Sequence, residues 1–178
     1  MRMVTPFVLL SFFLAPPAGM ALAADVGPLS ITIPVGFDGP TTGQNDGAVM
    51  TAWVKRRAGE DRGALLQISV VDLGSALSGI TIAQRAEGAK HYLSEFIGGV
   101  ARRRDNFKLG EVEPVSLAGI PAARVQWTGG VGPIQAIGVM YCVLVGTSIV
   151  SLHTEDTGSE ITPAMKSAMA AIEGVHVH

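Results

Sequence analysis

The chain has 178 residues with 13 Lys and Arg against 15 Asp and Glu, so its formal net charge is only −2. A protein that binds nucleic-acid phosphates needs a basic face, and this near-neutral balance argues against that class. Charged residues make up 16% of the chain and aromatic residues 6%, against a usual charged fraction of about 25%, so we expect a sheet with covered apolar faces and no stacking platform for bases or sugars.

The first 23 residues have the pattern of a secretory signal peptide. Arg2 provides the positive start, Val4–Leu14 is a short apolar segment, and Ala21-Leu22-Ala23 is a small-x-small cleavage site. The apolar segment is too short, and too interrupted by proline, to span a bilayer. We therefore expect residues 1–23 to be a cleaved signal peptide and residues 24–178 to form a single exported domain, periplasmic or secreted after cleavage near Ala23.

Cys142 is the one cysteine in the sequence, so the exported domain is expected to have no internal disulfide. It lies within the apolar run Val139–Val145, which predicts a buried thiol with a structural role. Because the cleavage site carries no cysteine, a lipid anchor of the lipoprotein type is not expected. The mature protein is predicted to be soluble.

The first half of the domain is predicted to contain three strands. Leu29–Ile33 alternates apolar and polar residues, and Ala48–Lys55 and Ala64–Val71 follow as two further strands. The intervening segment Gly36–Gly47 is rich in Gly, Thr, Asn and Asp, and it is predicted to be a loop.

A long helix is predicted to begin after Thr81. Thr81 and Gln84 have the spacing of a capping box, in which each side chain satisfies a backbone N–H group at the helix start. Gly98-Gly99 is expected to end the regular part, and Arg102-Arg103-Arg104 follows where cations favour the helix dipole. Apolar residues recur on one face at helical spacing, namely Ile82, Ala86, Ala89, Leu93, Phe96, Ile97 and Val100.

The second half is predicted to contain further strands and a final helix. Phe107–Leu117 and Ala122–Thr128 are expected to pair around a turn at Ala118–Pro121, and Gly129–Pro133 is an expected loop. The final helix is predicted to begin with Thr162 as its N-cap and Pro163 as its first residue, and to end at Gly174.

The stretch Ile134–Leu152 contains no charged residue and has the length of a transmembrane helix. Its β-branched content and the central Gly146-Thr147 favour a hairpin of Ile134–Val145 and Ser148–Thr154 instead. A central hairpin covered by helices on both faces would show no alternation of polar and apolar residues. The sequence therefore predicts a buried hairpin.

No constellation in the sequence identifies an active site. His176 and His178 could lie on one side of an extended tail, but the acidic or cysteine partners that metal sites recruit are missing. Glu111 and Glu113 alternate along a strand, and a solvated strand face is favoured over a catalytic carboxylate pair. Gly129–Gly132 lacks the Gly-Lys-Ser/Thr ending of a phosphate-binding loop. We expect no catalytic residue, no cofactor and no metal.

Two short segments and the order of elements carry a family resemblance. Pro34-Val35-Gly36-Phe37 is similar to the opening strand and bend of the PsbP-like superfamily, which includes DcrB-like and LpqN-like envelope proteins, and Gly119–Arg124 is similar to its Gly-x-Pro-Ala-x-Arg hairpin. The resemblance implies that Gly119 and Pro121 set a turn that Arg124 holds. It also implies an α/β (α+β) sandwich, with two main helices packed on a twisted, mostly antiparallel sheet of about six to seven strands.

The same resemblance implies a non-enzymatic accessory or binding protein of the cell envelope. We expect the partner to be an envelope protein or a small apolar ligand, with no nucleic acid and no stable membrane insertion. Contacts are expected in the loop that carries Phe37 and Asp38 and at Arg102, Arg103 and Arg104, because loops and charged clusters on a rigid scaffold often bind. The alternative is a periplasmic hydrolase-like or metal-dependent enzyme of unknown substrate.

Overall fold

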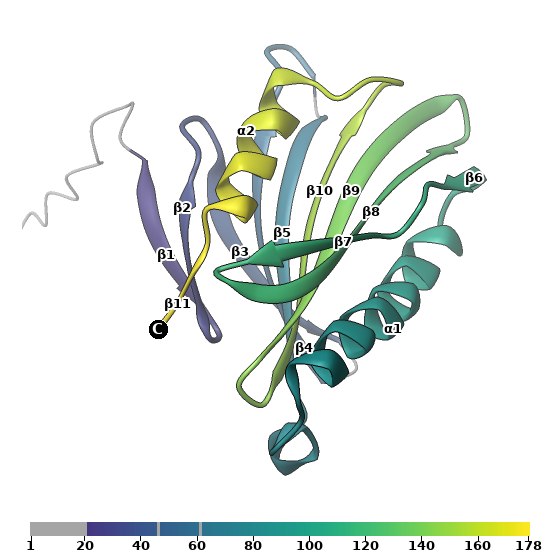
Figure 1. Cartoon of the computed structure of the whole chain (residues 1–178). Coiled ribbons are helices and arrows are strands. Elements are labelled where there is room, and N and C mark those ends of the chain that lie inside the picture. Colours follow the sequence, from purple (N-terminus) through teal and green to yellow (C-terminus); the bar gives the residue numbers. More distant parts are fainter. Residues whose placement is uncertain (1–20, 46, 61) are drawn as a thin grey trace, which may run out of the picture.

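The computed structural model describes residues 21–45, 47–60 and 62–178 (Figure 1). The helices in these residues are α1 (Ile82–Ala101) and α2 (Pro163–Glu173), with a short 3-10 turn η1 (Gly74–Leu77) before α1. The strands are β1 (Leu22–Val26), β2 (Leu29–Ile33), β3 (Asp38–Asn45), β4 (Ala48–Arg56), β5 (Gly63–Asp72), β6 (Asp105–Leu109), β7 (Glu113–Leu117), β8 (Ile120–Val131), β9 (Ile134–Val145), β10 (Ser148–Thr157) and β11 (His176–Val177).

The strands form one large antiparallel sheet and one small sheet. The large sheet has eight strands in the order β3-β4-β5-β10-β9-β8-β6, with β7 also paired to β8. The small sheet has the order β1-β2-β11. Two helices packed on a twisted, mostly antiparallel sheet were expected, and this α+β architecture is confirmed. The large sheet exceeds the expected size because of segments that the sequence pattern did not resolve as strands.

The segment Gly36–Gly47 accounts for one of these strands. It was predicted to be a loop, but Asp38–Asn45 forms the edge strand β3 and pairs with β4 up to Asn45 opposite Ala48. Every residue of β3 is exposed. Because neither face of this strand is covered, its sequence carries no apolar alternation, and periodicity could not reveal it.

The expected strand Phe107–Leu117 is also divided. It forms two strands, β6 and β7, which are separated by the non-strand residues 110–112. The two strands pair with different parts of β8. The predicted loop Gly129–Pro133 is wrong as well, because β8 continues through Gly129 and Gly130 to Val131. A Cβ atom on Gly130 would lie 2.8 Å from the backbone oxygen of Ile134, so the close approach of β9 requires glycine there.

Helix α1 packs on β8 and β9 through one apolar face, formed by the buried residues Ala89, Leu93 and Ile97. Its capping box is confirmed, with Gln84 N donating to Thr81 Oγ1 at 3.2 Å and Thr81 N donating to Gln84 Oε1 at 2.8 Å. Gly98 and Gly99 do not end the helix, which continues to Ala101. Ile82 is 72% exposed and does not belong to the packed face.

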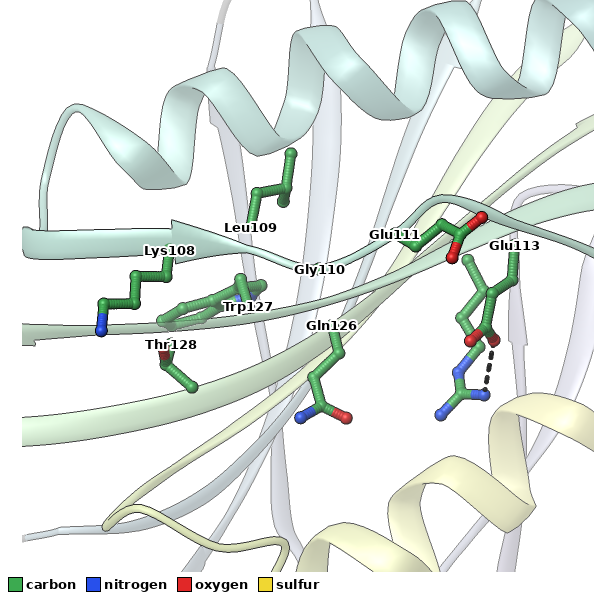
Figure 2. A pocket seen from close by; sticks show the side chains of 9 residues that line it. Lys108, Leu109, Gly110, Glu111, Glu113, Gln126, Trp127 and Thr128 are labelled. Carbon is green, nitrogen blue, oxygen red and sulfur yellow. Dashed lines mark hydrogen bonds and ion pairs between the residues drawn. The ribbon is translucent and has the colours of Figure 1, made fainter.

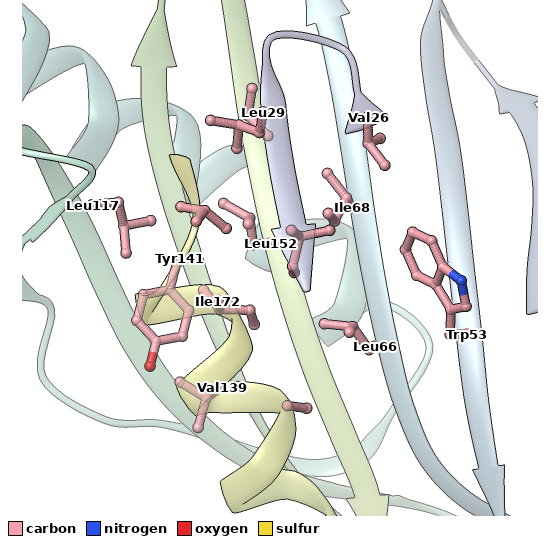
Figure 3. Close-up of a cluster of buried hydrophobic side chains, with 14 of the residues drawn as sticks. Val26, Leu29, Trp53, Leu66, Ile68, Leu117, Val139, Tyr141, Leu152 and Ile172 are labelled. Carbon is pink, nitrogen blue, oxygen red and sulfur yellow. The ribbon is translucent and has the colours of Figure 1, made fainter. Parts of the chain in front are cut away.

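The opposite face of the large sheet is covered by the small sheet and α2. Figure 3 shows side chains from the three groups meeting, including Leu29 of β2, Ile172 of α2 and Leu66 of β5. Each of these side chains is at most 1% exposed, and burying one such side chain stabilises the fold by about 1.5–3 kcal/mol. The expected burial of the β9–β10 hairpin on both faces is confirmed.

The stretch Ile134–Leu152 therefore lies in strands β9 and β10 and not in a transmembrane helix. None of the helices in the described residues has the length and apolar character needed to cross a membrane. Cys142 faces the α1 side of β9 and is fully buried, and burial raises the pKa of its thiol to about 12.

The predicted signal peptide lies mostly outside the described residues, which begin at Ala21. Leu22 and Ala23, at the predicted cleavage site, belong to β1 and pair with Ile33 and Thr32 of β2. Cleavage after Ala23 would leave Ala24–Val26 to pair with β2. Export and cleavage stay predictions.

Candidate functional site

A groove of about 470 Å³ lies between the C-terminal half of α1 and the part of the large sheet that this helix leaves uncovered. Strands β4, β5 and β10 form its floor, and α1 with the residues that follow it forms one wall. The floor includes Met50, Gln67, Ser69, Ser151 and His153, and the wall includes Phe96, Gly99, Val100, Arg102 and Arg103.

Strand alternation explains the mixed character of this floor. In β5, Leu66 and Ile68 point to the core beneath the small sheet, whereas Gln67 and Ser69 point into the groove. The pairing of β10 with β5 places His153 opposite Gln67 and Ser151 opposite Ser69. A polar row therefore crosses the sheet at the floor of the groove, and Ser69, Ser151 and His153 in this row are themselves buried. Gln67 and Ser69, the polar residues that interrupt the apolar β5 segment, are the sequence signal for this face, and this signal was missed.

A polar cluster that is partly shielded from water lies at one end of the groove. Arg104 Nη2 donates to both carboxylate oxygens of Glu155, at 3.0 and 2.8 Å. The Arg104 guanidinium also lies 5.4 Å from the centre of the Trp127 ring. Trp127 Nε1–H donates to His153 Nε2 at 3.3 Å. These contacts join the segment after α1 to β8 and β10 through side chains that are distant in sequence.

His153 is neutral in this cluster. Burial lowers the pKa of its imidazole, the Glu155 carboxylate acts in the opposite direction, and Arg104 lowers the pKa further. The hydrogen bond from Trp127 requires an unprotonated Nε2 atom, which agrees with the neutral form. His153 therefore accepts a hydrogen bond at the groove floor and carries no charge there.

Ser151, His153 and Glu155 share one face of β10 and present the residue types of a hydrolytic relay. Among the described residues, no hydrogen bond joins Ser151 to His153. Trp127 occupies Nε2 of the imidazole instead, and Glu155 pairs with Arg104. The arrangement offers hydrogen-bonding groups to a ligand without an activated nucleophile.

The residues that were expected to contact a partner lie in different parts of the structure. Arg102 and Arg103 are exposed and line the groove, whereas Arg104 is held by Glu155. Asp38 is exposed at the start of β3, away from the groove lining. Phe37 is only 9% exposed and packs in the core on the opposite face of the sheet. The expectation of a contact through Phe37 is therefore corrected, because its aromatic ring is used for packing.

A second concavity of about 360 Å³ lies over β8 where β6 and β7 separate (Figure 2). Glu111 and Glu113, considered from the sequence as a carboxylate pair, both line it. Glu113 accepts a 3.2 Å ion pair from Arg124, which Figure 2 shows as a dashed line. The Glu113 carboxylate is therefore paired with Arg124 across the two strands.

A third concavity, of about 320 Å³, lies beside the start of α2. Buried Asp156 accepts hydrogen bonds from Arg57 Nη2 at 2.7 Å and from Thr162 Oγ1 at 2.8 Å. Thr162 also accepts from the backbone N–H group of Met165, as its predicted N-cap role requires. These polar groups satisfy one another and fix α2 against β10.

The histidine tail does not assemble into a metal site. His176 lies in β11, and His178 Nδ1 lies 3.2 Å from Ser30 Oγ. Among the described residues, no three His, Cys, Asp or Glu side chains gather in a way that could hold a metal ion.

No protein-family model matches the chain, and no curated protein matches its sequence. Its structure is similar to cyanobacterial PsbP (CyanoP) from Synechocystis, with a TM-score of 0.58 and 11% identity over 92% of this chain and 97% of that one. It is also similar to LpqN of Mycobacterium tuberculosis, described as involved in cell envelope biogenesis, with a TM-score of 0.50 and 12% identity over 79% of this chain and 86% of that one.

The protein has a PsbP-like fold. Within this PsbP-like fold, Pro34-Val35-Gly36-Phe37 forms the turn that leads from the small sheet to β3. Phe37 N donates to Pro34 O at 3.2 Å, and Gly36 has a φ of +85°, as a type II turn requires at its third position. The packing of Phe37 anchors this turn.

The Gly119–Arg124 segment of the PsbP-like fold forms the β7–β8 hairpin. Its turn residues are Ala118 and Gly119, with φ values of +50° and +76°. Pro121 was expected in the turn, but it lies in β8 opposite Ser116 because the two-residue turn ends before it. Arg124 lies opposite Glu113 and forms an ion pair with it across the two strands.

Arg124 also connects the hairpin to the centre of the sheet. Its guanidinium lies 5.7 Å from the centre of the Tyr141 ring. The hydroxyl of Tyr141 donates to Glu173 Oε1 of α2 at 2.8 Å. Burial, together with the hydrogen bond to Glu173, raises the pKa of Tyr141.

Proposed function

We propose that this protein is an exported, non-enzymatic accessory protein of the cell envelope that binds its partner or ligand in the groove beside α1. The observation that carries the proposal is the groove itself. It combines exposed Arg102 and Arg103 with a floor of polar and apolar side chains, and it lies on a rigid sheet. Such a surface can bind without further rearrangement of the fold.

Two observations support the place of action. The pattern of Met1–Ala23 is that of an export signal. LpqN, which has a similar fold, is described as involved in cell envelope biogenesis. The export experiment below tests the envelope role.

The non-enzymatic part of the proposal is supported by the side chains of β10. Ser151 is not hydrogen-bonded to His153, and the Nε2 atom of His153 already accepts from Trp127. A serine nucleophile needs a base within hydrogen-bond reach. Glu155, the carboxylate on the same face of β10, is paired with Arg104.

Site-specific photo-crosslinking in the native host tests the proposed binding site. A photoreactive phenylalanine analogue at Phe96, on the groove wall, is compared with the same analogue at Ala170, which is exposed on α2. We expect a discrete crosslinked product from position 96 alone. Equal crosslinking from both positions would exclude the groove as the binding site.

Cell fractionation and N-terminal sequencing of the protein from the same cells test export. We expect protein in the envelope or medium fraction with Ala24 as its first residue. Full-length protein retained in the cytoplasm would contradict the proposed location. A broad hydrolase screen of purified protein completes the test, because turnover that His153→Gln abolishes would show that the protein is an enzyme.

A further inference from the structure

The floor of the groove suits a ligand that can form hydrogen bonds along its length. Gln67, Ser69 and Ser151 alternate on the floor with apolar neighbours such as Met50 and Met140. Gln67 Nε2 donates to Ser69 Oγ at 3.1 Å. The Gln67 amide oxygen and the Ser151 hydroxyl make no hydrogen bond within the part of the chain that the structure describes. A hydrocarbon chain laid over these groups would deprive them of water without replacing its hydrogen bonds.

The groove floor offers side chains, not a free strand edge. Strand β5 pairs with β4 on one side and with β10 on the other, so its backbone groups are already used. Met50, Ser69 and Ser151 are neighbours across these three strands. A ligand in the groove must therefore bond to hydroxyl and amide side chains, which both donate and accept. The backbone of an extended peptide has this combination of groups.

The wall leaves room for such a backbone at Gly99. A Cβ atom there would meet only the Arg102 side chain, at 3.8 Å. Phe96 and Val100 flank this glycine on the same wall and provide apolar contacts. The groove thus presents a space bordered by apolar side chains, which could receive alternate side chains of an extended segment.

Charge distinguishes the two ends of the wall. Arg102 and Arg103 are exposed and form no ion pair with any described residue, whereas Arg104 is held by Glu155. Glu95 lines the same wall about 10 Å before Arg102, at a helical rise of about 1.5 Å per residue. The arginine end attracts a carboxylate, and the Glu95 end repels one.

We propose that the groove binds an extended peptide segment of a partner protein, with an acidic side chain at the Arg102–Arg103 end and a neutral or basic residue near Glu95. This inference rests on the proposed function, because it names the class of partner for the same groove. It differs from the small apolar ligand expected from the sequence, since the polar floor and the two arginines favour a peptide.

Binding is tested with fluorescein-labelled six-residue peptide libraries and the full mature protein. The second residue is fixed as Glu, Gln or Lys, and the other positions are mixtures of Ala, Ser, Thr, Val, Leu and Phe. Fluorescence anisotropy should show that the Glu library binds about tenfold more tightly than the Gln library and that this preference falls as salt is added. A second fixed Glu three positions further on should weaken binding, because of Glu95.

Two pairs of variants localise the binding. Arg102→Ala with Arg103→Ala should remove the preference for Glu, whereas Lys166→Glu on α2 gives the same change in net charge and should keep it. Gly99→Leu should fill the groove and abolish binding. Gly98→Leu is the matched control, since a Cβ atom at Gly98 also meets only Arg102, at 3.8 Å, but Gly98 does not line the groove. Urea unfolding verifies that each variant is folded.

The possible results separate this inference from the proposed function. Equal binding of the Glu, Gln and Lys libraries, or an equal effect of Gly98→Leu and Gly99→Leu, would overturn the peptide inference. Dodecyl phosphate serves as the amphiphile probe, and its binding without any peptide binding would also overturn the inference while leaving the groove as a binding site. If neither the peptides nor dodecyl phosphate bind, and position 96 gives no specific crosslink, the peptide inference and the proposed function are both overturned.

Discussion

Arg104 and Glu155 are 51 residues apart in sequence and form a two-bond ion pair between the segment that follows α1 and strand β10. Their side chains are 17% and 22% exposed, so the pair is partly shielded from water. The Arg104 guanidinium also covers the Trp127 ring. This pair fixes the end of α1 where the groove wall meets its floor, and it leaves Arg102 and Arg103 as the exposed cations of the wall.

Removing this ion pair should lower the stability of the domain. In Arg104→Met, the apolar stem is largely kept, but Glu155 loses its partner beside buried His153. We expect the free energy of unfolding to fall by about 2 kcal/mol. Urea denaturation measures this change. The neighbouring Arg103→Met is the control and should change stability by less than about 0.5 kcal/mol; equal effects of the two variants would contradict the assigned role of the pair.

Stability should depend on pH through His153. The pKa of this buried imidazole is lowered in the folded protein, so between the folded pKa and about pH 6.5 the unfolded chain binds the extra proton. The free energy of unfolding should therefore decrease as the pH falls from 7 toward 5, by at most about 1.4 kcal/mol per pH unit from this group.

Urea unfolding at several pH values measures the effect of His153. In His153→Gln the amide oxygen can still accept from Trp127, and the slope below about pH 6.5 should become shallower. His91→Gln is the control, because His91 is exposed on α1. If the wild type and His153→Gln show the same pH slope, His153 is not the group responsible.

Gly138 should tolerate no side chain. It lies opposite Trp127 in the β8–β9 pairing, and a Cβ atom on Gly138 would overlap the indole ring. Gly138→Ala should therefore displace Trp127 and lower the free energy of unfolding by about 1–3 kcal/mol. Urea denaturation, followed by tryptophan fluorescence, measures the loss.

Gly43→Ala is the matched control for this steric effect. A Cβ atom at Gly43, in the exposed strand β3, would meet only Met50 Cε at 3.9 Å. Its stability should stay within about 0.5 kcal/mol of the wild type. A similarly small effect of Gly138→Ala would show that the indole ring does not pack against this glycine.

The β7–β8 turn should become more stable when Ala118 is replaced by Gly. Ala118 has a φ of +50°, a left-handed conformation that a Cβ atom disfavours. We expect Ala118→Gly to raise the free energy of unfolding by about 0.5–1 kcal/mol in thermal or urea denaturation. Ser116→Gly, in the adjacent strand and without a positive φ, should instead lower it. A loss of stability in Ala118→Gly would contradict the assigned turn.

Elements with strong local signals were predictable from the sequence. The capping box of Thr81 and Gln84, the N-cap at Thr162 and the β9–β10 hairpin depend on residues close together in the chain. Strand β3 and the extension of β8 through Gly129 and Gly130 lacked such signals. Strand pairing determined both, since neighbouring strands supply the hydrogen bonds that keep them extended.

The candidate site shows the same division. The sequence identified Arg102, Arg103 and Arg104 as a charged cluster, but it could not show that Glu155 would hold one of the three. It also proposed Phe37 as a contact residue, because an aromatic side chain beside a glycine-rich segment gives no local sign of which face it packs against. Those outcomes depend on partners that are far away in the chain.

The sequence alone determined the helix caps, the apolar hairpin and the buried character of Cys142, because each follows from side-chain spacing over a few residues. Only the tertiary structure decided that α1 covers β8 and β9 while leaving part of β4, β5 and β10 open. The groove exists because this helix covers less width than the eight-stranded sheet provides. Where a helix lies across a sheet depends on long-range packing, which no local pattern encodes.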